Sequence, residues 1–263
     1  MLEYITWNVS RHIIKLGSFE IRWYGLLFGL GFVCAYLVLQ RIFKREEVKP
    51  ELLDKLTLYI AVATVLGARL GHVLFYEPTY YFNHPGEILK VWEGGLASHG
   101  AAVAIILAAI IFSKVYKLNL WWLFDRISII IPLVAAFVRT GNLINSEIFG
   151  RPTNVPWAFI FVKADNIPRH PSQIYEAGSY LILFAILLTV YYKKGKTLSN
   201  GFIAGLMLTC LFTLRFFIEF FKDIQVSFEH SLPIDMGQIM SIPLILTGIV
   251  FMVIALRKKE SLP

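Results

Sequence analysis

A group of charged and amide side chains follows one of the most apolar stretches of the chain. Arg139, Asn142 and Glu147 come directly after the apolar run 127–137. A charged side chain at mid-bilayer depth costs about 2.5 kcal/mol or more and is rarely kept without a function. If a helix continues through this stretch, Arg139, Asn142 and Ser146 share one face, with Glu147 beside it. The guanidinium could then bind a phosphate, or it could pair with Glu147 and only hold helices together.

A second set of charged side chains interrupts a run of phenylalanines. Arg215, Glu219 and Lys222 are spaced i, i+4 and i+7 and therefore share a helix face. Arg215 is the second candidate for binding an anion, and the alternative is an Arg215–Glu219 pair within the helix. Arg69, with His72 at i+3, is a similar candidate with fewer polar neighbours.

His99 is the candidate general base. It lies among small residues at the start of an apolar run, and an imidazole with a pKa near 6.5 can accept a proton at neutral pH. A lone histidine is more often structural, so both interpretations stay open. The sequence contains no H-E-x-x-H, C-x-x-C, G-x-S-x-G or P-loop motif. This argues against metalloprotease, serine hydrolase and nucleotide-driven functions, and we expect neither a metal nor a cofactor.

The composition is that of an integral membrane protein. Hydrophobic residues make up 57% of the 263 residues and charged residues 16%, against roughly a quarter charged in soluble domains. A transmembrane helix needs about 20 apolar residues. Seven runs satisfy this: 21–43, 56–76, 96–116, 127–149, 174–192, 201–221 and 236–256. The net charge is +7, but the Lys and Arg residues cluster at the ends of these apolar runs and form no basic groove. We therefore expect no nucleic-acid partner.

The distribution of positive charge predicts the orientation of the spans. With the N-terminus outside and the C-terminus in the cytoplasm, the inside segments hold most of the 25 Lys and Arg residues. The candidate residues then all fall on the external side of the membrane. The proline-rich segment 151–173 is too polar to cross the membrane, and we interpret it as a small external cap. No repeat or linker divides the chain, so residues 1–263 are expected to form a single domain.

Close helix packing is also indicated by the sequence. Glycines recur at i and i+4 in three of the apolar runs, which allows neighbouring helices to approach closely. The pairs are Gly25 and Gly29, Gly67 and Gly71, and Gly201 and Gly205.

Residues 138–152 resemble the signature of the bacterial prolipoprotein diacylglyceryl transferases, Gly-Arg-x-Gly-Asn-Phe-x-Asn-Gly-Glu-x-x-Gly-Arg. The resemblance extends along nearly the whole chain. Its further segments are 22–25 (RWYG), 67–71 (GARLG), 92–95 (WEGG) leading to His99 and Gly100, 169–176 (RHPSQIYE), 215–221 (RFFIEFF) and 236–243 (MGQIMSIP). The chain departs from the family where Val138, Leu143, Ser146, Ala101 and Lys222 replace Gly, Phe, Gly, Gly and Arg respectively. None of these changes removes a reactive group.

The resemblance implies a seven-span enzyme of the bacterial inner membrane with its active site on the external side. It implies transfer of the diacylglyceryl group of phosphatidylglycerol to the lipobox cysteine of a prolipoprotein, with release of glycerol phosphate. The catalytic residues it implies are Tyr24, His99, Arg139, Asn142 and Arg215. The residues implied to bind phosphatidylglycerol are Arg139, Asn142, Arg215, Gly150, Glu147 and Glu219.

Two other functions use the same features. A lipid transporter or flippase would also bind anionic headgroups, but it calls for polar residues through the full membrane depth and for inverted repeats. Here the polar residues gather on one side. A non-catalytic membrane scaffold would use the arginines only to hold helices together.

Overall fold

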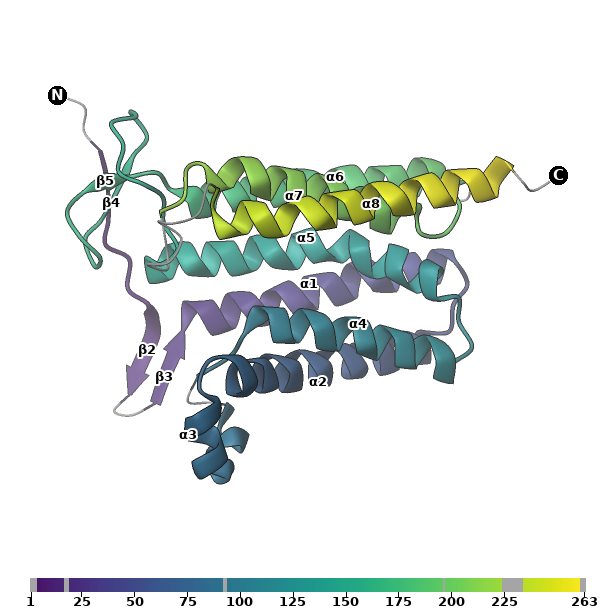
Figure 1. Ribbon diagram of the computed structural model, residues 1–263, viewed down its shortest axis with the longest axis horizontal. Coiled ribbons are helices and arrows are strands. Elements are labelled where there is room, and N and C mark those ends of the chain that lie inside the picture. The colour runs from purple at the N-terminus through teal and green to yellow at the C-terminus, as the bar shows by residue number, and fades with distance from the viewer. Residues whose placement is uncertain (1–3, 17–18, 92–93, 196, 224–233, 261–263) are drawn as a thin grey trace. The chain divides into compact units, whose positions relative to one another are not determined.

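The computed structural model is mainly helical (Figure 1) and describes residues 4–16, 19–91, 94–195, 197–223 and 234–260. Within these residues, seven helices are long and apolar enough to cross a membrane. They are α1 (Trp23–Arg45), α2 (Pro50–Phe75), α4 (Ser98–Val115), α5 (Leu120–Asn145), α6 (Ser172–Lys194), α7 (Phe202–Glu219) and α8 (Met236–Glu260). The predicted all-α polytopic fold with seven spans is confirmed. The orientation of the termini stays a prediction.

Short elements lie before the first span and between later ones. Between α2 and α4 lie α3 (Pro78–Asn83) and the 3₁₀ helix η1 (Pro85–Leu89), and five short strands form two small sheets. The strands are β1 (Ile5–Trp7), β2 (His12–Leu16), β3 (Phe19–Arg22), β4 (Phe159–Phe161) and β5 (Pro168–Arg169). In one sheet, β4 lies between a parallel β1 and an antiparallel β5; in the other, β2 and β3 form an antiparallel hairpin. The proline-rich segment 151–173 thus contributes two strands, and the N-terminal segment adds a third.

The chain forms two compact units, residues 1–38 with 125–263 and residues 39–124. We call them the first and the second unit; α1 and α5 contribute to both. That residues 1–263 form a single domain stays a prediction. In the first unit, the starts of α1, α6 and α8 and the ends of α5 and α7 gather at one end, beside β4 and β5 (Figure 1). The polar residues of this unit lie on the segments that meet there.

Glycines allow close helix contacts in both units. In the second unit, a Cβ on Gly71 of α2 would lie 2.8 Å from the Cα of Gly100 of α4. In the first unit, a Cβ on Gly205 of α7 would lie 2.6 Å from the carbonyl oxygen of Gly248 of α8. The predicted packing role is confirmed at these positions and at Gly67. By contrast, Gly25 and Gly29 have no described atom of their own unit within 4 Å of a Cβ.

Helix α5 ends earlier than the sequence predicts. Its last residue is Asn145, and Ser146 follows with φ 56°. Ser146 N–H donates to the Leu143 carbonyl (3.0 Å), and Glu147 N–H donates to the Asn142 carbonyl (3.1 Å). This is the Schellman helix end, whose left-handed position favours glycine. The expected stripe of Arg139, Asn142 and Ser146 is therefore wrong at Ser146, because the turn takes residues 146 and 147 out of the helix.

Helix α7 likewise ends at Glu219. Lys222 lies beyond the helix, in an isolated bridge with Gly150, so the expected three-residue face of Arg215, Glu219 and Lys222 holds only for the first two. Backbone pairing beyond the helix explains the early end. Phe220 is followed by backbone that pairs with another segment, and a paired segment cannot continue the helical hydrogen-bond ladder.

Candidate active site

Arg139 is held from two directions at the end of α5. Its Nε lies 2.9 Å from Oε2 of Glu176 on α6, and its Nη1 donates to Oδ1 of Asn142 (3.2 Å). The Glu176 side chain is completely buried, and neither of its oxygens accepts a hydrogen bond from a described residue. The 2.9 Å contact is therefore a charge contact whose N–H is not aimed at the oxygen. The alternative pairing of Arg139 with Glu147 does not occur among the described residues.

Glu147 is held by amides rather than by a cation. Its Oε1 accepts hydrogen bonds from Nδ2 of Asn142 (2.7 Å) and Nδ2 of Asn145 (3.3 Å). The Glu147 carbonyl accepts from Nε2 of Gln173 on α6 (2.8 Å). The next residue, Ile148, has φ 57°, a strained conformation for a β-branched residue that is typical of functional sites. Asn142 thus links Arg139 to Glu147.

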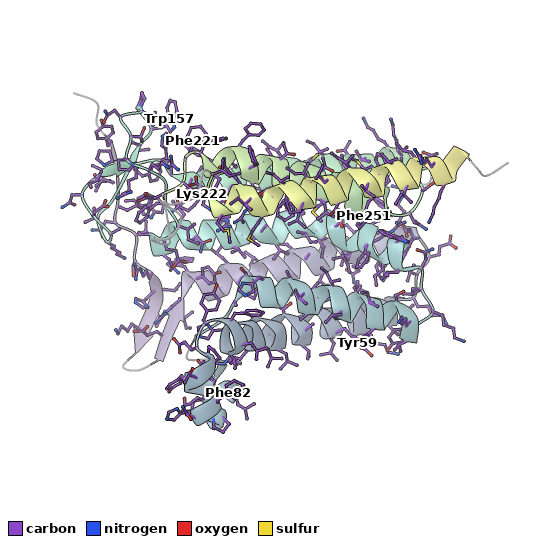
Figure 2. All side chains as sticks on the ribbon, in the orientation of Figure 1. Tyr59, Phe82, Trp157, Phe221, Lys222 and Phe251 are labelled. Carbon is purple, nitrogen blue, oxygen red and sulfur yellow. The ribbon has the colours of Figure 1, made fainter. Side chains whose placement is uncertain are left out.

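Lys222, which is buried, supplies a second cation in this cluster. Its side chain is 6% exposed, and its Nζ lies 3.3 Å from Oε2 of Glu219 and 3.9 Å from Oε1 of Glu176. Figure 2 shows Lys222 just beyond the end of α7. Glu219 therefore pairs with Lys222, and the alternative Arg215–Glu219 pair is not formed within the described segments. Lys222 thus lies between two carboxylates, one of which, Glu176, it shares with Arg139.

Arg215 differs from these paired groups. In the part of the chain that the structure describes, no carboxylate lies within 4 Å of its guanidinium, although the side chain is only partly exposed. Its charge acts on the hydroxyl of Tyr180 on α6, which is also close to Arg139 and Glu176. Arg215 therefore lies near the same cluster, and its N–H groups donate to no carboxylate of the described residues.

Gly150 lies where three chain segments cross. Its N–H donates to the His170 carbonyl (2.8 Å), and it bridges to Lys222. A Cβ at this position would lie 2.4 Å from the Phe221 carbonyl oxygen and 2.6 Å from the His170 Cβ, so only glycine fits. The crossing brings the segments after α5, before α6 and after α7 together. This packing supports a positioning role for Gly150, and its contact with lipid stays a prediction.

Arg169 fixes the same crossing from the cap side. Its guanidinium contacts the carboxylates of Asp165 and Asp223, each at 2.7 Å, and donates to the Gly150 carbonyl (3.2 Å). The hydrogen bond from Arg169 holds the pKa of Asp165 below its usual value. Nearby, partial burial lowers the pKa of His170. These ion pairs tie the cap to the end of the helices.

Tyr24 joins the cluster from the start of α1. The carbon atoms of its ring approach Gly141 of α5 so closely that a Cβ there would lie 2.7 Å away. The charges of Glu147 and Arg139 both act on its hydroxyl. The first unit therefore brings together the predicted residues Tyr24, Arg139, Asn142, Glu147, Gly150, Arg215 and Glu219.

His99 belongs to the second unit. It is exposed at the start of α4, with its ring stacked on Tyr76 (centroids 5.8 Å apart) and edge-on to Phe75 (5.6 Å). The Tyr76 ring also stacks on His72, with centroids 5.4 Å apart. An exposed imidazole is open to a substrate, and the role of His99 as the base stays a prediction.

Arg69 of the second unit has a structural role. It is buried, and it donates to the carbonyls of Ile88 (2.9 Å) and Gly94 (2.8 Å) and to those of Glu87 and Gly95. Its guanidinium also lies over the ring of Tyr81. With these N–H groups engaged, Arg69 organises the loop before α4, and the geometry does not support its candidacy as an anion-binding residue. Residues 92 and 93 of the quoted WEGG segment lie outside the described residues.

Two site residues were missed by the sequence analysis of candidate residues. Glu176 and Gln173 lie in the first turns of α6, and both side chains are fully buried. A signal for Glu176 was present, because an acidic residue at the start of an apolar run requires a cationic partner. For Gln173 the only signal was its place in the segment 169–176 (RHPSQIYE), which also contains Glu176. Among the described residues, no group of three or more His, Cys, Asp and Glu is arranged to hold a metal ion.

Comparison with known proteins identifies the family. Residues 11–254 match the family described as prolipoprotein diacylglyceryl transferase. Three relatives carry the name phosphatidylglycerol–prolipoprotein diacylglyceryl transferase. The protein of Tolumonas auensis is 45% identical and aligns over 96% of this chain and 98% of its own length. The corresponding values are 42%, 98% and 97% for Chloroherpeton thalassium, and 40%, 99% and 98% for Bacteroides fragilis. The chain is thus a multi-pass bacterial membrane enzyme that belongs to the prolipoprotein diacylglyceryl transferase family.

Proposed function

We propose that the chain transfers the diacylglyceryl group of phosphatidylglycerol to the lipobox cysteine thiol of prolipoproteins. Within the site, the state of Arg215 is the observation that best supports this proposal. Arg215 is a partly buried cation without an ion pair among the described residues, and it lies in a cluster where the other cations are paired. An uncompensated charge in such a position is costly, and a lipid phosphate would compensate it.

The headgroup phosphate binds between Arg215 and Arg139. Glu176 lies at Nε of Arg139 and Asn142 accepts from its Nη1, and in this proposal a second phosphate oxygen binds to the remaining N–H groups of the guanidinium. Fixed donors of this kind stabilise a developing charge without having to reorganise during the reaction. Tyr24, Glu147 and Glu219 line the same cluster and orient the headgroup, with Lys222 and Gly150 holding the segments that carry them.

The reaction is a displacement at carbon. The cysteine sulfur attacks the carbon of the diacylglyceryl group that is bonded to a phosphate oxygen. A C–S bond forms at this carbon, and its C–O bond to the phosphate breaks. The electron pair of that bond leaves on glycerol phosphate, whose extra negative charge is stabilised by the two arginines. A thiol with a pKa near 8.5 must lose its proton to react, and His99 accepts it in this proposal. The residues require no metal or cofactor for these steps.

The site faces the external side of the bacterial inner membrane. Most Lys and Arg residues between the spans lie on the opposite side if the N-terminus is outside, as the positive-inside rule favours. A secreted prolipoprotein presents its lipobox on that external side. The proposed orientation is tested by cysteine accessibility at exposed positions of the cap and of the α4–α5 connection in sealed vesicles.

The activity test uses the purified protein reconstituted with phosphatidylglycerol and a synthetic lipobox peptide. We expect the peptide to gain the mass of one diacylglyceryl group. A peptide with serine in place of the lipobox cysteine, and vesicles of phosphatidylethanolamine alone, serve as controls that should show no gain. Folded protein that gives no mass gain with phosphatidylglycerol would contradict the proposed reaction.

A further inference from the structure

The hairpin of β2 and β3 has two chemically different faces. Ile14 and Ile21 are cross-strand partners, and their side chains are 47% and 38% exposed. Side chains alternate between the faces of a strand, so the neighbouring pair of Lys15 and Glu20 lies on the opposite face. The hairpin thus carries an apolar pair on one face and charges on the other.

The charged face is held together by one carboxylate. Glu20 contacts Lys15 at 2.8 Å, Arg22 at 3.0 Å and His12 at 3.4 Å. Hydrogen bonds from Lys15 and Arg22 lower the pKa of Glu20 from its usual 4.5 to about 2, so it remains ionised at any physiological pH. The exposed Arg11 adds a further cation. Cations therefore outnumber the single acid on this hairpin.

The hairpin is fixed next to a membrane span. β3 ends at Arg22 and α1 begins at Trp23, whose N–H donates to the carbonyl of Arg11 at 3.1 Å. Figure 1 shows the two strands running across the start of α1 instead of continuing along its axis. Because α1 crosses the membrane, a hairpin that runs across its end lies along the membrane surface.

We propose that the β2–β3 hairpin lies in the headgroup layer of the leaflet in which α1 begins, and binds anionic phospholipid there. Ile14 and Ile21 face the acyl chains. The exposed Arg11 reaches the phosphates, and Lys15 and Arg22, although paired with Glu20, present their remaining N–H groups to them. Amphipathic surface elements bind membranes through this combination of apolar burial and charge, and long basic side chains extend to the phosphate level. The apolar area that two isoleucine side chains can bury is far smaller than the roughly 800 Å² per partner of a stable protein interface. This favours lipid over a protein as the occupant.

The test places a fluorophore on each face of the hairpin. Cys34 and Cys210 are free cysteines; both are replaced by alanine, and this background is checked for transferase activity. Ile14→Cys, Ile21→Cys and, as the matched control, Lys15→Cys are then labelled with an environment-sensitive dye. The proteins are reconstituted in phosphatidylcholine nanodiscs containing phosphatidylserine, with or without a nitroxide on the upper acyl chain. Phosphatidylserine supplies the negative charge without being the proposed substrate.

We expect the dyes at positions 14 and 21 to emit at shorter wavelength and to be quenched several-fold more strongly than the dye at position 15. Equal quenching on both faces, or no quenching at 14 and 21, would overturn the location in the membrane. Omitting phosphatidylserine should weaken the quenching of the dye at position 14. In the Arg11→Gln variant, the quenching at position 14 should change less when phosphatidylserine is omitted. Quenching that is the same with and without phosphatidylserine would overturn the preference for anionic lipid.

Discussion

Two arginines that look alike in the sequence have different partners in the two units. Arg69 and Arg139 each interrupt an apolar run near the end of a helix. Arg69 donates to four backbone carbonyls of residues 87–95. Arg139 contacts a buried carboxylate and an amide. The partners of each arginine therefore distinguish one that shapes a loop from one that lies in a polar cluster.

Arg215 extends the comparison, since it has no ion pair among the described residues. Carbonyl dipoles can satisfy the N–H groups of a buried arginine completely, which leaves nothing for a ligand. An arginine without such partners keeps its full capacity to bind a planar anion through two hydrogen bonds. Arg69, Arg139 and Arg215 thus form a series in which fewer protein partners leave more donors for phosphate.

The largest effect is expected for Arg215→Gln. This change removes one of the two charges that stabilise the leaving phosphate, and loss of one such group typically lowers kcat about 10²–10³-fold. Because no ion pair is broken, the melting temperature should stay close to that of the wild type. Activity is measured by the mass gain of the lipobox peptide. Arg215→Lys is the control that keeps the charge but loses the bidentate geometry, and it should recover part of the activity. Wild-type activity in Arg215→Gln would refute the assignment.

Glu176→Gln should affect both stability and activity. The change leaves Arg139 and Lys222 without their shared buried carboxylate, and breaking a buried ion pair costs about 3–5 kcal/mol. Arg139 also loses its fixed orientation, so kcat should fall more than the affinity for phosphatidylglycerol. Thermal unfolding in detergent and the separate measurement of kcat and KM check the two effects. A loss of stability with unchanged kcat would reduce Glu176 to a structural residue.

Arg69→Gln should lower stability without a comparable loss of activity per folded molecule. Four carbonyls lose their donor, and a buried unsatisfied polar group costs about 1–3 kcal/mol. Amide hydrogen exchange should rise in residues 87–95, and the melting temperature should fall. Arg215→Gln on α7 is the matched variant, for which we expect the opposite result: a large loss of activity with little change in melting temperature. If Arg69→Gln kept its stability but lost activity, the contrast between the two arginines would be wrong.

The sequence predicted the spans well because each depends on a local property. Twenty or so apolar residues can satisfy their backbone in a bilayer only as a helix, and the seven spans follow from that. The pairing of charges depended on contacts between distant segments. Glu176 and Lys222 meet Arg139 and Glu219 because Gly150 lets three segments cross, and no periodicity encodes such a crossing. The strands of β1, β4 and β5 are two or three residues long, too short to show an alternating pattern.

The smallest expected effect comes from Ser146→Gly at the end of α5. Ser146 adopts φ 56°, and the left-handed conformation costs about 1–2 kcal/mol for a residue with a Cβ. Glycine removes that cost but is itself more flexible when unfolded, so we expect a net gain of about 1 kcal/mol or less and a slightly higher melting temperature. The Ser146 hydroxyl is buried and has no hydrogen-bond partner among the described residues, so its removal should lose nothing. Ser146→Ala is the control: it deletes the hydroxyl while keeping the Cβ, and should stabilise less than glycine. If alanine and glycine raise the melting temperature equally, the gain comes from the hydroxyl and not from the turn that places Glu147 beside Asn142.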